Sequence, residues 1–129
     1  MSEVRGIVVA HGHLARCLAE TTESISGILG AIQPISNADC SPEILVKRIR
    51  EAVDGGRVIV FVDLDSGSCC HAARSVCRGV PEVPVVSGVN VPMLLDFVFH
   101  RDMEPVELAR RLVSKGQSGV VAHLPGFSS

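Results

Sequence analysis

Short apolar runs alternate along the chain with longer segments in which apolar residues recur every three or four positions. The runs cover residues 4–9, 31–36, 58–62 and 83–88, and their length and β-branched content predict buried strands. The longer segments cover residues 14–29, 42–53, 69–77, 92–99 and 105–115, and their spacing predicts helices. This alternation is typical of βαβ units, so we expect an α/β protein with an open, mostly parallel sheet.

Local signals predict where several of these elements begin and end. Ser41 followed by Pro42 is typical of a helix start, because serine caps the first turn and proline suits its first position. Gly30 predicts the end of the first helix. Pro34 places the second strand near a sheet edge, since proline cannot donate to a strand ladder. The first helix is expected to bury one face, made of Leu14, Cys17, Leu18, Thr21, Ile25 and Ile28.

Composition narrows the class of protein. The 129 residues suit one domain, 1–129, with a frayed tail over 125–129, and the 47% hydrophobic content predicts a folded core. A net charge of -2, with no tryptophan or tyrosine, gives no indication of a basic, aromatic surface that would bind nucleic acid. No apolar run reaches the roughly 18 residues of a membrane span. The N-terminus lacks a secretion signal, and the odd count of 5 cysteines favours reduced thiols, so we expect a cytoplasmic protein.

Two of the predicted strands end in ionisable side chains. His11 follows the first strand, and Asp63 follows the third. In a flavodoxin-like order, 2-1-3-4, these two strands are neighbours beside the point where the strand order reverses, which is where such sheets bind ligands. We therefore expect His11 and Asp63 to face each other.

Such a pair suits a nucleophilic histidine. A carboxylate that accepts one ring N–H fixes the imidazole tautomer and leaves the other nitrogen with a free lone pair. Ser66, Gly67 and Ser68 follow Asp63 at the start of the next helix, where hydroxyl and backbone N–H groups approach an anion. Together these features predict transfer of a phosphoryl group onto His11 by positioning and charge stabilisation, with no metal or other cofactor.

Four segments resemble one known family, in order and at matching spacing. They are GIVVAHGHLARCL, VFVDLDSGSCCHAA, VVSGVNVPMLLD and SKGQSGV. They resemble the strand–HG–helix opening, the D-x-x-G-G-S-P-x-N-A-A loop, the GVN-x-P-M-L segment and the late G-x-x-G-V segment of the enzyme IIA component of the mannose-type sugar phosphotransferase system. SGVNVPMLL is the most specific part. The chain departs from the pattern at Asp65, at Cys69, where the family has proline, and at His71, where it has asparagine.

The resemblance implies a set of partners. The family's histidine takes a phosphoryl group from the histidine-containing phosphocarrier protein and passes it to a IIB component, and by position that histidine is His11. The protein would reach the membrane only indirectly, through a transporter complex. The resemblance also implies a homodimer in which the last strand, expected here over 118–124, is exchanged between subunits.

The resemblance also assigns roles to particular residues. Asp63 matches the family's aspartate, and Ser68 matches its phosphate-contacting serine. Gly12 and Gly67 fall on matching glycines, and Asn90 falls on the family's asparagine. Gly12 and Asn90 are expected to shape loops or contact a partner.

Two alternatives to a transport role remain open at this point. The same domain, phosphorylated on His11, can act as a regulatory module that signals by binding and has no transport role. A metal-binding protein is the second alternative, because the loops also hold enough ligands for zinc, although their spacing matches no ligand motif. Those ligands are His11, His13, Asp63 and Asp65, with the run Cys69-Cys70-His71.

Overall fold

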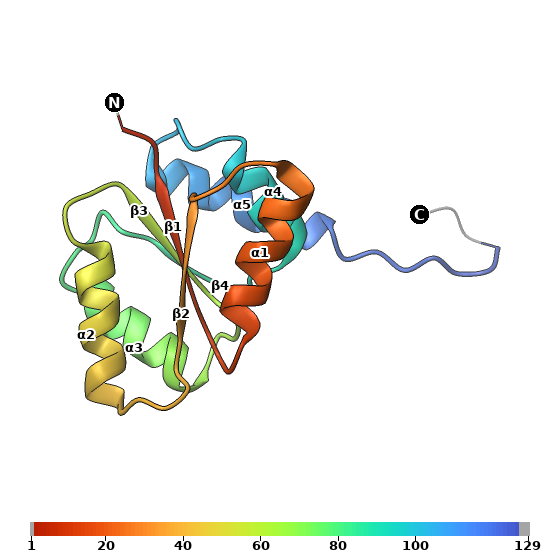
Figure 1. Ribbon diagram of the computed structural model, residues 1–129. Coiled ribbons are helices and arrows are strands. Elements are labelled where there is room, and N and C mark those ends of the chain that lie inside the picture. Colours follow the sequence, from red (N-terminus) through yellow and green to blue (C-terminus); the bar gives the residue numbers. More distant parts are fainter. Residues whose placement is uncertain (1, 127–129) are drawn as a thin grey trace.

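A four-stranded, all-parallel sheet runs through the computed structural model, which describes residues 2–126 (Figure 1). The elements in chain order are β1 (Arg5–Ala10), α1 (Leu14–Ser26), β2 (Ile32–Ser36), α2 (Pro42–Val53), β3 (Val58–Val62), α3 (Gly67–Cys77), β4 (Val85–Ser87), α4 (Val91–Val98) and α5 (Pro105–Ser118). The strand order is β2-β1-β3-β4, which confirms the order expected from the sequence.

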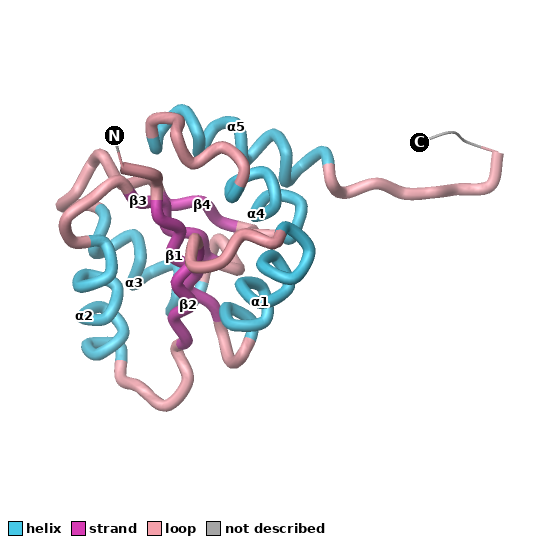
Figure 2. The backbone as a smooth tube through the Cα atoms, turned by 45° about the horizontal axis from the view of Figure 1, so that its top comes forward, coloured by secondary structure: helices cyan, strands magenta, loops and turns pink. Residues whose placement is uncertain are grey.

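Helices cover both faces of the sheet. Figure 2 shows α1, α4 and α5 on one side and α2 and α3 on the other. Side chains alternate between the two cores, so that Val8 and Phe61 enter the first core and Val9 and Val60 enter the second. Because both faces are buried, the strands are continuous apolar runs without alternation, and this is why they stand out in the sequence.

Pro34 lies on the edge strand β2, opposite Val8 of β1, as its sequence position predicts. The carbonyl of Ala31 accepts the Gly6 N–H, and the Asn37 N–H donates to the Ala10 carbonyl. The backbone N–H and C=O groups of odd-numbered residues in this segment therefore point toward β1. Successive residues of a strand point their backbone groups to opposite sides, which turns Pro34 toward the open edge. Its missing N–H therefore costs the sheet no hydrogen bond.

Close packing of α4 onto the sheet depends on a residue without a side chain. A Cβ on Gly6 would lie 2.7 Å from the Phe97 ring. That ring meets Phe61 edge to face, with centroids 5.3 Å apart. Such edge-on aromatic pairs are favourable beyond the area they bury. Gly6 thus gives the Phe97 ring the space it needs against β1.

Helix α1 is shorter than its apolar pattern predicts. We expected Gly30 to end it, but the helix ends at Ser26, and Gly27 takes a left-handed conformation with φ 76°. The Gly27 N–H donates to Glu23 O at 2.9 Å and closes the last turn. The first available glycine ends the helix, because it adopts this conformation at little steric cost.

The buried face of α1 also differs from the predicted one. The buried residues are Ala15, Ala19 and Thr22. Of the predicted face, Leu18 and Ile28 pack partly buried against the core, whereas Cys17, Thr21 and Ile25 are exposed. Small side chains allow the helix backbone to approach β1 and β2 closely. Hydrophobicity alone favours the larger residues, so the predicted face was rotated from the observed one.

Helix α2 follows the sequence prediction closely. Ser41 is its N-cap, and its hydroxyl accepts the Ile44 N–H at 3.2 Å, with Pro42 in the first turn. The predicted core face is buried: Leu45, Ile49, Ala52 and Val53. Here the capping residue and the spacing of apolar residues indicate the same helix, and the structure confirms the prediction.

The last predicted strand, over 118–124, does not form in the single chain. Helix α5 continues through Ser118, and the described residues after it, 119–126, extend away from the body without strand structure (Figure 1). A strand forms by hydrogen-bonding to a neighbouring strand, and none of the four strands of the described sheet pairs with this segment. The expected frayed tail, 125–129, lies partly outside the described residues, which end at residue 126.

None of the helices in the described part of the chain has the length and apolar character needed to cross a membrane.

Candidate active site

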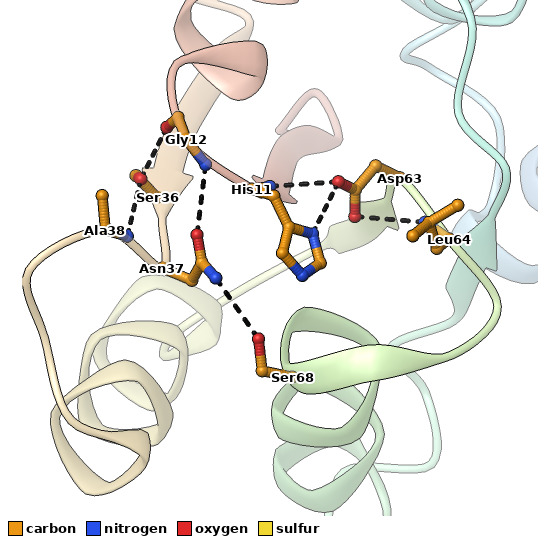
Figure 3. A network of polar contacts seen from close by, with 8 residues as sticks. All are labelled: His11, Gly12, Ser36, Asn37, Ala38, Asp63, Leu64 and Ser68. Carbon is orange, nitrogen blue, oxygen red and sulfur yellow. Dashed lines mark hydrogen bonds and ion pairs between the residues drawn. The ribbon is translucent and has the colours of Figure 1, made fainter.

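His11 and Asp63 meet at the carboxyl ends of β1 and β3. The His11 Nδ1 lies 2.8 Å from Asp63 Oδ2, and the same oxygen accepts the His11 backbone N–H at 3.0 Å (Figure 3). The other carboxylate oxygen accepts the Leu64 N–H at 3.1 Å. The aspartate is thus fixed by its own loop and by the histidine that it faces, in the arrangement expected from the strand order.

These hydrogen bonds determine the protonation of the pair. Burial of Asp63 on its own raises the pKa of the carboxyl group, but the hydrogen bonds from the His11 N–H and imidazole outweigh burial and lower that pKa below its usual value. The carboxylate is therefore ionised at neutral pH and can only accept. The proton of the contact therefore lies on Nδ1, and in the neutral imidazole the lone pair is then on Nε2.

The start of α3 lies against this free nitrogen. Gly67, the first helical residue, has φ 87°, and a Cβ built there would lie 3.6 Å from His11 Nε2. Ser66 occupies the N-cap position but makes no capping hydrogen bond with its side chain. The positive end of the helix dipole therefore faces the place where an anion bound to Nε2 would lie.

A residue that sequence reasoning missed, Asn37, connects the two loops. The Gly12 N–H donates to Asn37 Oδ1 at 3.1 Å, and Asn37 Nδ2 donates to Ser68 Oγ at 3.3 Å. The Ser36 hydroxyl donates to the Gly12 carbonyl at 2.6 Å. β2 ends at the same edge of the sheet as β1, so the strand order was the signal that could have placed the segment after β2 in the site.

Asn90, the other asparagine singled out by the sequence, has structural contacts. It is the N-cap of α4, and its side-chain oxygen accepts the Met93 N–H at 2.9 Å. Its Nδ2 donates to the Gly116 carbonyl at 3.0 Å. Asn90 therefore holds the junction between α4 and α5, and these contacts do not involve the His11 loop.

Asp65 lies beside the site in a surface cavity of about 300 Å³. The cavity lining brings an acid and several basic groups together: Asp65, Ser66, Gly67, Cys70, His71, Arg74 and Arg78. Asp65 is exposed to solvent, and two arginines share its cavity. Positive charge on these arginines would act against the repulsion between Asp65 and a phosphoryl group nearby.

Among the described residues, the group of possible metal ligands is smaller than the sequence suggested. It contains His11, Asp63 and Cys69, with ligand atoms within 4.8 Å of one another, and does not include His13, Asp65 or His71. Burial, with the nearby charge of Asp63, raises the pKa of the Cys69 thiol to about 11. A bound metal would have to displace the proton of this thiol. The group offers three protein ligands, one fewer than the four of a structural zinc site.

Comparison with known proteins agrees with this fold and site. The model of the family described as PTS system fructose IIA component matches residues 6–112. The chain belongs to this family and is a mannose-type IIA component of the sugar phosphotransferase system. Such components are phosphotransferases of sugar uptake.

Curated relatives of the chain are named for mannose and for sorbose. It is 30% identical over 123 residues to the PTS system mannose-specific EIIAB component of Escherichia coli, covering 90% of this chain but only 38% of that protein. It is also 30% identical over 97 residues to the sorbose-specific EIIA component of Lacticaseibacillus casei, covering 70% of this chain and 68% of that one.

Solved structures share the fold over nearly the whole chain. The mannose/sorbose-specific IIA subunit from Enterococcus faecalis superposes with a TM-score of 0.81 at 26% identity, covering 98% of this chain and all (100%) of that one. The EIIA component from Streptococcus agalactiae superposes with a TM-score of 0.85 at 23% identity, covering 92% of this chain and 96% of that one. Because the Streptococcus agalactiae protein is only 23% identical, its similarity shows the fold alone.

Proposed function

We propose that this protein accepts a phosphoryl group on His11 Nε2 from the histidine-containing phosphocarrier protein and passes it to a IIB component. The contact between His11 and the ionised Asp63 carries the proposal, because it leaves Nε2 as a nucleophile of fixed direction. We further propose that residues 1–129 form one IIA domain that acts in the cytoplasm.

The transfer exchanges one nitrogen–phosphorus bond for another. The Nε2 lone pair of His11 attacks the phosphorus, and the bond to the donor's imidazole breaks, with its electron pair returning to that ring. The Nδ1 proton stays on His11, where Asp63 stabilises the positive charge that develops on the ring. The reverse attack, by a nucleophile of the IIB component, regenerates the free histidine.

Groups around Nε2 stabilise the transferring phosphoryl group. The start of α3 supplies backbone N–H groups and the positive end of a helix dipole, and Ser68 supplies a hydroxyl. Gly67 keeps the space beside Nε2 open. Catalysis is then positioning and electrostatic stabilisation, and no cofactor takes part.

The names of the relatives support the choice of partners. The Escherichia coli relative is named as a joined IIA and IIB protein, which supports a IIB component as the acceptor. This chain spans about 38% of that relative's length, so here a IIB component is a separate partner or lies outside the given sequence. The membrane is then reached only through the transporter complex.

A homodimer accounts for the extended C-terminal segment. Val120, Val121 and Leu124 are 79%, 54% and 56% exposed. Three large apolar side chains within five residues are costly to leave in water, and a second copy of the chain would cover them. In the dimer that we propose, each segment crosses to the partner and forms there the strand that the single chain lacks.

Intact-mass measurement tests the phosphoryl acceptor directly. The protein is incubated with phosphoenolpyruvate, enzyme I and the phosphocarrier protein, beside the variant His11→Ala. We expect one added phosphate that is labile in acid and absent from the variant. A wild-type protein that stays unmodified with a competent donor, or a His11→Ala variant that is still modified, contradicts the proposal.

A further inference from the structure

We propose that Asn37 is a positioning residue of the phosphoryl site, which turns the Ser68 hydroxyl proton toward the phosphoryl group on His11. This inference rests on the proposed function of His11. It starts from the one side chain that contacts both the acceptor loop and the start of α3 in the network of Figure 3.

The direction of the Asn37 amide follows from its neighbours. The Gly12 backbone N–H can only donate, so the amide atom that lies 3.1 Å from it must be the oxygen. The amide nitrogen then faces Ser68, at 3.3 Å from Oγ. This nitrogen carries protons and no available lone pair, so Ser68 Oγ is the acceptor in the contact.

The Ser68 hydroxyl is thereby oriented. An oxygen that accepts from Asn37 keeps its own proton for another acceptor. In Figure 3 the His11 ring lies beside the contact between Asn37 and Ser68 and points toward the start of α3, so a phosphoryl group on Nε2 would lie next to this contact. Ser68 then donates to a phosphoryl oxygen, and the second amide proton of Asn37 is available to the same group.

Asn37 itself is held firmly enough to do this. Its backbone N–H donates to Ala10 O at 3.4 Å, at the end of β1, and its carbonyl accepts the Cys40 thiol at 3.5 Å. The side chain is half-buried, and both ends of its amide are engaged. A preorganised donor costs no reorientation when charge develops on the phosphoryl group.

Phosphoramidate is the probe that tests this role, because it phosphorylates histidine without a protein donor. The rate at which His11 is phosphorylated is followed by peptide mass spectrometry in the wild type and in Asn37→Asp. The aspartate keeps an oxygen for the Gly12 N–H, but its second oxygen accepts the Ser68 proton and turns it away. We expect Asn37→Asp to react at His11 about tenfold more slowly or worse, and its phosphohistidine to hydrolyse faster.

A double-mutant cycle separates orientation of Ser68 from support of the loop. If Asn37 acts through Ser68, Asn37→Ala combined with Ser68→Ala reacts no more slowly than the slower single variant. Ser36→Ala is the matched control, because it removes a hydrogen bond to Gly12 but leaves the contact between Asn37 and Ser68. We expect it to slow the reaction less than Asn37→Ala does.

Other outcomes overturn the proposal. If the two substitutions slow phosphorylation of His11 independently, so that their effects multiply in the double variant, Asn37 only supports the loop. A Ser36→Ala variant that reacts as slowly as Asn37→Ala leads to the same conclusion. The exposed His13 is the internal control, and its reaction should not change in any variant. Reaction of His11 with phosphoramidate but not with the phosphocarrier protein would contradict the proposed donor and leave the role of Asn37 testable. Failure of phosphoramidate at wild-type His11 would contradict both.

Discussion

Gly67 brings the start of α3 next to the nucleophile. The residue has a left-handed φ of 87°, and its missing Cβ would lie 3.6 Å from His11 Nε2 and from Cε1. That distance is an ordinary contact for the free imidazole. The glycine suits the left-handed turn, and it leaves the ring edge beside Nε2, where the proposed phosphoryl group would be attached, without a methyl group.

Gly67→Ala should therefore slow phosphorylation of His11 by about 10²-fold, because the methyl group displaces the phosphoryl group from its donors. The left-handed conformation should also cost about 1 kcal/mol of folding free energy. Phosphorylation rate and urea unfolding measure the two effects. Gly55→Ala is the matched control, since Gly55 has φ 77° and open space around its missing Cβ. An equal slowing in both variants would show that backbone strain alone is responsible.

The central pair of the site could be predicted from the sequence, but its connections could not. His11 and Asp63 follow the two most clearly apolar strands, so topology alone brings them together. An asparagine after a strand is also an ordinary turn residue, so Asn37 gave no signal of its own. Its contact with Ser68 depends on two loops 31 residues apart in the chain, which no local pattern records.

At the scale of elements, one ion pair joins α4 to α5 on the first face of the sheet. Arg111 Nε and Nη2 donate to the two oxygens of Asp96, at 2.7 and 3.0 Å. His100 lies on the same carboxylate, with Nδ1 3.4 Å from Oδ1. The hydrogen bond from Arg111 lowers the pKa of Asp96, and this outweighs burial, which acts in the opposite direction.

Asp96→Asn should lower the free energy of unfolding at pH 7, and the difference from wild type should shrink in acid. A carboxyl whose pKa is lower in the folded state stabilises the protein above its unfolded pKa of about 3.9, and this stabilisation is lost as pH falls through the folded pKa. Urea unfolding at several pH values from 7 down to 3 measures it. The exposed Glu107→Gln on α5 is the control. A difference that does not change with pH would contradict the assignment.

An element could be predicted correctly where its capping residues and the spacing of its apolar residues indicate the same helix, as in α2. The prediction was wrong in part where these signals differ, as in α1. In α2, Ser41, Pro42 and the apolar face all indicate the same helix. In α1, large apolar residues suggested a face around Cys17 and Ile25, but the sheet packs against the small residues Ala15 and Ala19. Contact with a sheet depends on shape as well as hydrophobicity, and the pattern of a single helix does not contain the shape of its neighbour.

At the scale of the whole molecule, residues 119–126 extend away from the body, and no strand contains them (Figure 1). The sequence did indicate an extended segment here. The missing information was the identity of the strand's neighbour, which in the proposed homodimer belongs to a second copy. The sequence pattern of one chain cannot show that the strand which pairs with this segment belongs to a second chain.

Truncation after Ser118 should convert the proposed dimer to a monomer, because it removes the three exposed apolar side chains of the segment. Sedimentation velocity of the full chain and of the truncated chain at equal concentration measures the change. The truncated protein should still react at His11 with phosphoramidate, since the site is built from β1, β3 and α3. A full chain that sediments as a monomer, or a truncated chain that stays dimeric, would contradict the proposed exchange.

The outward-facing Pro34 has a consequence for how copies of this protein can assemble. An open sheet has two edges, and addition of a strand at both would allow copies to join without end, as in a fibre. β2 is one of these edges, and Pro34 removes an N–H donor from the middle of its open side. Addition of a strand is therefore disfavoured at the β2 edge, and β4 is the edge of this sheet at which a strand from a second copy can add.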